Sequence, residues 1–282
     1  GVRVATIHAE PDGLNINAAC GSTHPDSLAR AVVERGAQVG LAHDGDGDRT
    51  IAVDEKGRLV DGDAIMGILA EVLHREGRLR GGAVVATVMS NLGLEVFLRQ
   101  AGLRLVRTPV GDRHVLDEML RGGYSLGGEQ SGHIIFLDHA TTGDGMLTAL
   151  QLLWVLAHTG ATLSALAGRI PRYPQVLRNV RLPNGLRYRA TPRIERALQE
   201  AKDVLGERGR ILVRRSGTEP LVRIMVEGAD GDEVARVAGM LEEVIGGGTV
   251  TPDLMRMAES PRRVVDTAGF GAAVACAISK AE

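Results

Sequence analysis

Short apolar strands and one amphipathic helix alternate through the first sixty residues of the chain. Residues 2–8 are β-branched and alternate in polarity, which predicts a strand. Residues 27–35 repeat their apolar positions with helical spacing, and Gly36 follows at a favoured helix end. Residues 38–42 and 50–53 predict two further strands, separated by a polar loop. A strand–helix–strand order is typical of a mostly parallel α/β layer.

The middle of the chain repeats this alternation, and the C-terminal part changes it. Between residues 63 and 168 the pattern predicts helices at 63–76, 92–101, 115–121, 148–158 and 163–168, and strands at 82–88, 103–108 and 134–137. The sequence Ile-Pro-Arg-Tyr-Pro at 170–174 breaks the pattern and marks a domain boundary. Beyond it, strands at 176–182, 210–213 and 221–227 and helices at 192–205 and 231–244 predict an α+β domain. Three glycines at 246–248 read as a linker to a C-terminal tail whose role the sequence does not indicate.

Composition excludes several classes of protein. Lys and Arg total 33 and Asp and Glu 35, so the formal net charge is −2, unlike a general nucleic-acid binder. Only 2% of the residues are aromatic, which argues against platforms that stack single-stranded bases. Two cysteines are too few for a disulfide framework, and no apolar run is long enough for a membrane span. We therefore expect a cytoplasmic protein with no nucleic-acid or membrane partner.

The most distinctive loop places Asp44, Asp46 and Asp48 at alternate positions between glycines. The glycines allow the chain to wrap tightly, and three carboxylates suit Mg²⁺ or Ca²⁺ better than zinc. A solvated acidic turn is the plainer alternative. An EF-hand is excluded, because Arg49 occupies the position where that loop requires Gly, and strands rather than helices flank the loop.

Two further loops carry polar groups that suit a phosphorylated sugar. The turn Gly-Gly-Glu-Gln-Ser-Gly-His at 127–133 exposes a carboxylate, a hydroxyl and an imidazole, which can hydrogen-bond to sugar hydroxyls. The run Arg-Arg-Ser-Gly-Thr-Glu-Pro at 214–220, with Arg223 beyond it, can surround a phosphate. It is not a Walker loop, since the sequence contains no such motif. Taken singly, a structural turn and a charged hairpin remain alternatives for these two loops.

The three loops in this order resemble the α-D-phosphohexomutase family. Within it, the sequence is similar to the bacterial members that act on glucosamine phosphates. The segments that carry this finer resemblance are 13–17 (GLNIN), 20–25 (CGSTHP), 108–113 (TPVGDR), 138–145 (DHATTGDG) and Gln130 in the second loop. The resemblance covers residues 1–245.

The resemblance implies four domains around a cleft, of which this chain holds the later ones. Residues 1–62 are assigned to the end of domain 2, which contains the loop with Asp44, Asp46 and Asp48, here called the metal loop. Residues 63–170 are assigned to domain 3 with the loop 127–133, the sugar loop, and residues 171–246 to domain 4 with the loop 214–220, the phosphate loop. Residues 247–282 form a tail of unknown role. The implied fold is a series of α/β domains with mixed sheets followed by a C-terminal α+β domain.

The resemblance also implies an activity and a role for each site residue. The family interconverts sugar phosphates through a phosphoserine and a bisphosphorylated sugar that also serves as primer. For this subfamily the reaction converts glucosamine 6-phosphate to glucosamine 1-phosphate, for UDP-N-acetylglucosamine and cell-wall precursors. One Mg²⁺ per chain is implied. The implied roles are metal binding by Asp44, Asp46 and Asp48; catalysis by Arg49 and His133; and substrate binding by Asp112, Arg113, Glu129, Ser131, Arg214, Ser216, Gly217, Thr218 and Arg223.

One departure from the family pattern limits these expectations. The family's phosphoserine loop reads close to Ala-Ser-His-Asn-Pro, and the sequence contains no such run. Ser22 lies in a different stretch, which the glucosamine-phosphate enzymes carry in addition to their serine loop. We therefore expect this chain to lack the serine domain and to be inactive alone. A mutase for mannose or glucose phosphates, or a non-catalytic phosphosugar-binding module, remains an alternative. The oligomeric state is open.

Overall fold

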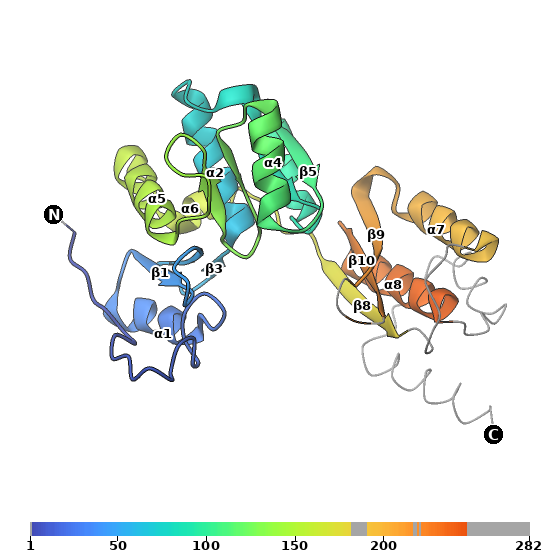
Figure 1. Cartoon of the computed structure of the whole chain (residues 1–282), viewed down its shortest axis with the longest axis horizontal. Helices are drawn as coiled ribbons and strands as arrows, with labels where there is room; N and C mark the ends of the chain where they lie inside the picture. The colour runs from blue at the N-terminus through green and yellow to red at the C-terminus, as the bar shows by residue number, and fades with distance from the viewer. Residues whose placement is uncertain (1, 182–190, 217–218, 220, 247–282) are drawn as a thin grey trace.

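Three sheets with helices packed on them make up the computed structural model, which describes residues 2–181, 191–216, 219 and 221–246. The N-terminal sheet and the central sheet lie side by side, and the C-terminal sheet lies at the far end of the molecule (Figure 1). One sheet is mixed, and the last forms an α+β unit. The α/β fold class predicted from the sequence is confirmed.

The N-terminal sheet differs from the predicted parallel layer. Its strands β1 (Val39–His43), β2 (Thr50–Asp54) and β3 (Leu59–Val60) are antiparallel in the order β1-β2-β3, and α1 (Asp26–Arg35) packs on them. The connections between these strands are too short for the crossover that a parallel pair needs, so the prediction was wrong. Residues 2–8 form no strand, and Val2 is 77% exposed. Alternating β-branched residues alone do not supply a pairing partner.

The central sheet is covered by helices on both faces. It has the order β5-β4-β6-β7, formed by β4 (Ala83–Thr87), β5 (Arg104–Thr108), β6 (Leu126–Gly128) and β7 (Ile134–Phe136), with only β7 antiparallel. Helices α2 (Gly62–Arg75) and α3 (Leu92–Gln100) share the larger apolar core on one face. Helix α4 (Asp112–Gly122) packs on the other. The large aliphatic content of the sequence supplies this core.

Strand β6 escaped prediction because two of its three residues are glycines. A Cβ at Gly127 would lie 2.6 Å from the Met119 sulfur and 2.9 Å from the Val85 carbonyl oxygen. Glycine therefore lets α4 and β4 approach this strand closely, although it has low strand propensity.

Helix α5 joins the N-terminal and central parts. It spans Gly145–Thr159, contacts β1 and β2 as well as α2, and is followed by the short α6 (Leu163–Ala167) (Figure 1). Asp144 caps α5 by accepting a hydrogen bond from the Leu147 N–H. The helix thus begins beside the metal loop and covers the N-terminal sheet.

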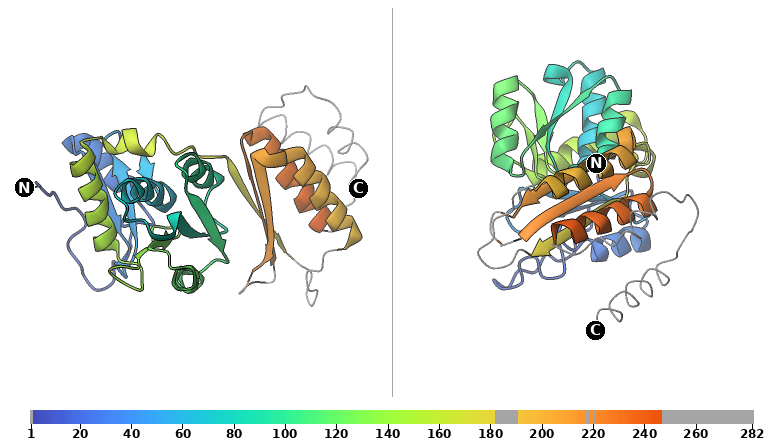
Figure 2. Two further views of the ribbon diagram at one scale, coloured as in Figure 1. Left: turned by 90° about the horizontal axis from the view of Figure 1, so that it is seen from above. Right: turned by 90° about the vertical axis from the view of Figure 1, so that its right-hand side faces the viewer.

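The C-terminal part is an antiparallel sheet with two helices on one face (Figure 2). The strands are β8 (Gln175–Arg181), β9 (Gly209–Arg215) and β10 (Leu221–Gly228), in the order β8-β10-β9. Helices α7 (Pro192–Leu205) and α8 (Gly231–Ile245) enclose a separate aliphatic core with the sheet. Two short 3₁₀ helices lie at Arg80–Gly82 and Gly206–Arg208. The predicted tail, 247–282, lies outside the described residues, and within them no helix is long and apolar enough to cross a bilayer.

Candidate functional site

The metal loop is the tight connection between β1 and β2. The two strands pair up to His43 and Thr50, so residues 44–49 must reverse the chain within six positions. Gly47 has a φ of +73°, and its N–H donates to the Asp44 carbonyl oxygen at 3.2 Å. Glycine is needed there because other residues rarely adopt this conformation.

Two of the three predicted metal ligands lie together in this loop. Arg49 Nε is 3.5 Å from an Asp44 oxygen and 3.9 Å from an Asp48 oxygen. Burial, and next the negative charge of Asp44, raise the pKa of Asp48. Asp48 Oδ1 is buried without a hydrogen-bond partner, whereas Asp46 is exposed. In the described part of the chain no three His, Cys, Asp or Glu side chains gather closely enough to hold a metal ion.

The donor chemistry of this loop nevertheless fits Mg²⁺. All three candidate groups are carboxylates, and Mg²⁺ prefers oxygen ligands and retains several waters, so it needs few protein ligands. The orphaned Asp48 oxygen beside Asp44 is where a hard cation would relieve the repulsion between the two carboxylates.

The sugar loop is joined to the metal loop through the backbone. The Thr50 N–H donates to the Gly132 carbonyl oxygen at 3.0 Å, and Arg49 and His133 form an isolated antiparallel bridge. Gly132 has a φ of +95°, and a Cβ there would lie 2.3 Å from the Thr50 carbonyl oxygen. Only glycine allows this approach.

A second backbone contact holds the metal loop against the start of α5. The Gly145 N–H donates to the Gly47 carbonyl oxygen at 2.9 Å. A Cβ at Gly145 would lie 2.5 Å from the Arg49 carbonyl oxygen. The metal loop is therefore clamped between the sugar loop and α5.

His133 lies inside this junction. Its side chain is buried, and its Nε2 accepts a hydrogen bond from the Gly143 N–H at 3.2 Å. The same nitrogen is 3.6 Å from Asp48 Oδ2, and Nδ1 has no hydrogen-bond partner. In this arrangement the ring holds residue 143 beside the metal loop. Its predicted role in proton transfer stays a prediction.

The other predicted sugar-binding residues follow the carboxyl ends of strands β5 and β6 in the central sheet. Glu129 Oε1 accepts a hydrogen bond from the Gly111 N–H at 3.2 Å, which ties the sugar loop to the start of α4. Asp112 and Arg113 are the first exposed residues of that helix, and Ser131 is exposed in the sugar loop. The structure thus brings both predicted sugar-reading segments together, next to the metal loop.

The predicted phosphate-binding arginines lie opposite each other on the C-terminal sheet. Arg214 of β9 is paired with Arg223 of β10, and Ser216 N–H donates to the Leu221 carbonyl oxygen at 2.9 Å. Glu219 donates its N–H to Ser216 Oγ and pairs with Arg223 at 3.1 Å. Gly217 and Thr218 lie outside the described residues. No hydrogen bond or ion pair in the described ranges links this hairpin to the metal or sugar loop.

Both arginines line a cavity of about 140 Å³. Its lining combines the two arginines and Asn179 with four apolar residues. The full lining is Met89, Leu177, Asn179, Leu212, Arg214, Arg223 and Met225. Met89 belongs to the loop after β4, so the cavity lies where the C-terminal sheet faces the central part of the molecule.

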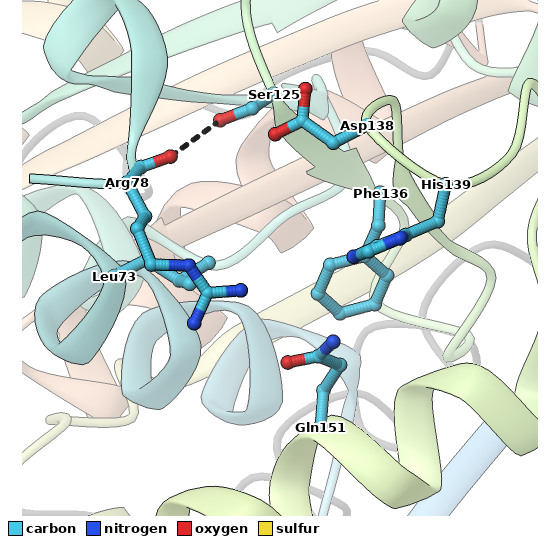
Figure 3. Close-up of a pocket in the computed structure, with 7 residues that line it drawn as sticks. All are labelled: Leu73, Arg78, Ser125, Phe136, Asp138, His139 and Gln151. Atoms are coloured by element: carbon cyan, nitrogen blue, oxygen red, sulfur yellow. Dashed lines mark hydrogen bonds between the residues drawn. The ribbon is translucent and has the colours of Figure 1, made fainter. Parts of the chain in front are cut away.

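A second cavity is too small for a sugar. It measures about 20 Å³, close to the volume of a single water site, and lies beside Arg78, Ser125 and Asp138 (Figure 3). Its remaining lining is Leu73, Phe136, His139 and Gln151. None of the predicted site residues contributes to it.

The sequence interpretation missed the residues that hold the loops together. Gly132, Gly145 and Thr50 make the backbone contacts, and Gly111 reaches Glu129, yet none was assigned a role. The density of glycines in these segments was the available signal, because glycine marks places where two backbones approach closely.

Comparison with known proteins matches most of the chain to one family. The family model described as phosphoglucomutase/phosphomannomutase, alpha/beta/alpha domain III, matches residues 61–173, and the model of the C-terminal domain of the same family matches residues 177–244. The chain is 56% identical over 247 residues to a phosphoglucosamine mutase of Moorella thermoacetica, covering 88% of this chain and 56% of the relative. It is 54% identical to one of Symbiobacterium thermophilum, covering 87% and 55%. The chain thus spans about half the length of these curated relatives.

Solved structures share the fold. A phosphoglucomutase/phosphomannomutase family protein from Burkholderia thailandensis is 25% identical with a TM-score of 0.64, over 80% of this chain and 50% of the other. An Aspergillus fumigatus N-acetylphosphoglucosamine mutase, in complex with GlcNAc-6P and magnesium, is 22% identical with a TM-score of 0.63, over 84% and 58%. The second likeness concerns the fold alone.

Proposed function

The chain belongs to the phosphoglucomutase/phosphomannomutase family, and we propose that its protein interconverts glucosamine 6-phosphate and glucosamine 1-phosphate. The observation that carries this proposal is the backbone junction of the metal loop, which Thr50–Gly132 joins to the sugar loop and Gly47–Gly145 joins to the start of α5. It holds a cation-binding loop beside groups suited to sugar hydroxyls. Relatives above 50% identity that are named phosphoglucosamine mutase support the choice of amino sugar.

In the proposed mechanism, the metal loop serves the phosphoryl group that moves. Asp44, Asp46 and Asp48 would hold Mg²⁺, which when bound offsets negative charge on that group. Arg49, anchored between Asp44 and Asp48, presents a further positive charge beside them. These residues act by position and electrostatics.

The remaining residues orient the substrate. Glu129 and Ser131 would hold sugar hydroxyls, with Asp112 and Arg113 beside them reading which sugar is bound. Arg214 and Arg223, with Ser216, Gly217 and Thr218, would grip the phosphate that does not react, because guanidinium forks match phosphate oxygens. His133 would carry a proton in this scheme, close to Asp48.

The nucleophile is the one part of the reaction that these residues do not supply. The reaction needs a group that stores the phosphoryl between two half-reactions, with a bisphosphorylated sugar as primer. No Ala-Ser-His-Asn-Pro run occurs in the sequence. We therefore expect a polypeptide of these 282 residues to bind phosphosugar without converting it, and the product of the complete enzyme to feed UDP-N-acetylglucosamine synthesis.

Calorimetric titration of glucosamine 6-phosphate into the chain tests the binding part of the proposal. Arg214→Ala should weaken binding by about tenfold or more, because a charge-assisted hydrogen bond to phosphate is lost. Arg236→Ala, which removes an arginine of α8 that pairs with Glu233 of the same helix, should bind like the parent chain. Equal affinity of all three proteins, or no binding by the parent, contradicts the assignment.

A mutase for mannose or glucose phosphates is the second candidate. The matched family models carry the names of those sugars, and the notion of a metal loop, a sugar loop and a phosphate loop applies to them as well. In a complete enzyme, the ratio of kcat/KM for glucosamine 1-phosphate and mannose 1-phosphate separates the two candidates. A preference for mannose would favour the second.

A further inference from the structure

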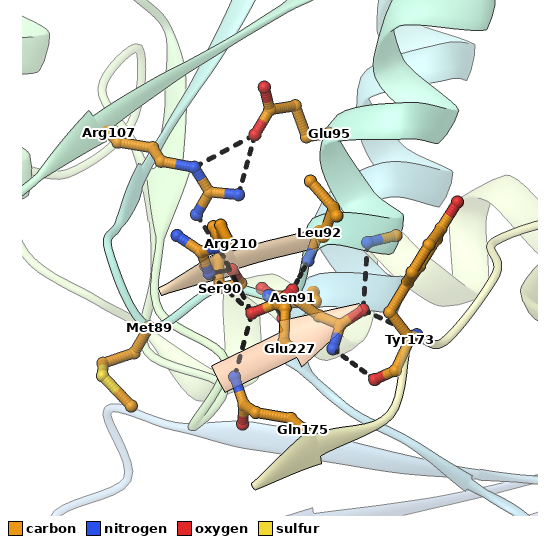
Figure 4. A network of polar contacts seen from close by, with 12 residues as sticks. Met89, Ser90, Asn91, Leu92, Glu95, Arg107, Tyr173, Gln175, Arg210 and Glu227 are labelled. Atoms are coloured by element: carbon orange, nitrogen blue, oxygen red, sulfur yellow. Dashed lines mark hydrogen bonds and ion pairs between the residues drawn. The ribbon is translucent and has the colours of Figure 1, made fainter. Parts of the chain in front are cut away.

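A buried glutamate connects the C-terminal sheet to the central part of the molecule. Glu227, at the end of β10, is 0% exposed. Its carboxylate accepts hydrogen bonds from the Leu92 N–H, from Gln175 Nε2 at 3.2 Å and from Arg210 Nη2 at 2.8 Å (Figure 4). Leu92 opens α3 of the central part, so this carboxylate spans the boundary between the two parts.

Arg210 spans the same boundary from the neighbouring strand. Its Nη2 pairs with Glu227 and also donates to the Ser90 carbonyl oxygen at 2.6 Å. Arg107 of β5 donates to that same carbonyl at 2.9 Å and pairs with Glu95. Burial, and next the charge of Arg210, lower the pKa of Arg107. The loop after β4, residues 88–91, is thus gripped by side chains from both parts.

The segment 170–174, which connects the central part to the C-terminal sheet, is hydrogen-bonded to the loop 88–91. Asn91 accepts a hydrogen bond from the Tyr173 N–H and donates to the Tyr173 carbonyl oxygen, both at 3.0 Å. The Gly228 N–H donates to the Pro174 carbonyl oxygen at 3.1 Å. A Cβ at Gly93 would lie 1.6 Å from the Pro171 carbonyl oxygen, so the segment lies directly on the start of α3.

The strand register connects Glu227 to the phosphate-binding arginines. Side chains two residues apart share one face of a strand, so Glu227 and Arg223 lie on the same face of β10. On β9, their register partners are Arg210 and Arg214. Four residues of strand separate the two rows by roughly 13 Å. A shift of the Glu227 row on the central part would therefore move the Arg214 and Arg223 row with it.

We propose that Glu227, through Arg210 and the Leu92 N–H, is a positioning residue that sets where Arg214 and Arg223 stand relative to the sugar loop. This inference rests on the proposed function and adds to it a residue that touches neither sugar nor phosphate. A buried ion pair contributes little net stability, because its desolvation offsets much of its attraction. Its donors and acceptors do, however, demand one geometry. The cavity of about 140 Å³ between Met89 and the two arginines depends on that geometry.

Two spin labels measure the position of the C-terminal part directly. They are placed at Gln100→Cys on α3 and Arg196→Cys on α7, both exposed, in a chain carrying Cys20→Ser and Cys276→Ser. Glu227→Ala leaves the Leu92 N–H without its acceptor, and it leaves Arg210 with the Ser90 carbonyl oxygen but without its carboxylate partner. The distance distribution should become at least about twofold wider, because domains without a fixed interface move relative to each other. Glu227→Gln, which keeps an acceptor oxygen but loses the charge, should lie between Glu227→Ala and the parent.

Affinity for glucosamine 6-phosphate tests whether this position matters for binding. If Glu227→Ala reduces the fraction of molecules in the binding geometry to about a tenth, Kd rises about tenfold. Glu242→Gln is the matched control, because Glu242 forms an exposed ion pair with Arg178 inside the C-terminal part itself. It should leave both the distances and the affinity unchanged.

Each result decides a separate claim. Distances in Glu227→Ala that superimpose on the parent overturn the proposal, as do widened distances with unchanged affinity. Circular dichroism and the melting of the C-terminal core verify that the variant is folded. If the parent chain does not bind glucosamine 6-phosphate, the proposed function is contradicted. In that case the distances between the two spin labels still test whether Glu227 fixes the position of the C-terminal part.

Discussion

The central part of the molecule meets its two neighbours in different ways. At the N-terminal junction, backbone lies on backbone, and Gly132 and Gly145 remove the side chains that would keep the chains apart. At the C-terminal junction, charged side chains reach across, with Glu227 and Arg210 gripping the loop after β4. The first junction fixes its groups mainly through backbone contacts that glycines permit, with the buried His133 ring inside it. The second junction depends on the ion pair between Glu227 and Arg210, which Glu227→Gln should weaken and Glu227→Ala should remove.

The difference corresponds to what each junction positions. In the proposed mechanism, the metal and sugar loops hold a cation and a reacting phosphate within about an ångström of a fixed geometry. Backbone contacts without flexible side chains suit that requirement. In the same mechanism, Arg214 and Arg223 grip a phosphate that does not react, so a junction made of long side chains is sufficient. The metal and sugar loops thus form one rigid unit, to which the arginine pair is attached.

Replacing a junction glycine should break the rigid unit, with the largest effect. Gly132→Ala forces a Cβ to within 2.3 Å of the Thr50 carbonyl oxygen at a φ of +95°. We expect a loss of about 4 kcal/mol in the free energy of unfolding, from strain and overlap together. Chemical denaturation measures it. Gly123→Ala is the matched control, because it also has a positive φ, +68°, but nothing lies near its Cβ. Equal losses in both variants would show that close approach contributes nothing.

Asp63 lies between the two junctions, and its ionisation should make stability depend on pH. It accepts the Asn91 N–H at 2.7 Å, and burial, and next the charge of Asp61, raise its pKa to about 7. The folded state therefore holds the proton more tightly than the unfolded chain. The contribution of Asp63 to the free energy of unfolding is fully present below about pH 4 and is lost as the pH rises to about 7.

The substitution Asp63→Asn isolates this dependence. We expect the parent to lose about 4 kcal/mol of unfolding free energy between pH 4 and pH 8 through Asp63, and we expect the variant to be free of this loss. Denaturation curves at both pH values provide the measurement. Parallel pH profiles of the parent and the variant would contradict the assignment.

The metal loop provides the prediction with the smallest effect. Asp46 is exposed, and among the described residues its side chain forms no hydrogen bond or ion pair with Asp44 or Asp48, so Asp46→Ala should leave the junction and the stability unchanged. Mg²⁺ affinity should fall about tenfold, because the cation loses one charged oxygen ligand. Calorimetric titration of Mg²⁺ measures this change. Equal heats from the parent and the variant would remove Asp46 from the ligand set.

The local sequence predicted most helices and strands and the three site loops, but it did not predict contacts between segments that are distant in the sequence. Helices 192–205 and 231–244 and the site loops follow from periodicity and residue type, which are local properties. The antiparallel N-terminal sheet and strand β6 do not, since pairing partners and glycine packing depend on the rest of the fold. From the sequence, Glu227 is predicted only as the last residue of the strand 221–227. Its burial against Leu92 depends on residues 135 positions apart.

The mutase assay tests the central claim most directly, namely that this chain holds the metal, sugar and phosphate loops but not the phosphoryl-storing serine. Conversion of glucosamine 6-phosphate to glucosamine 1-phosphate is followed with Mg²⁺ and a bisphosphate primer. The 282-residue chain is compared with the same chain fused to a phosphohexomutase domain that carries the Ala-Ser-His-Asn-Pro loop. We predict turnover by the fusion and none by the chain alone. Turnover by the chain alone that disappears in Ser22→Ala would contradict the account and make Ser22 the nucleophile.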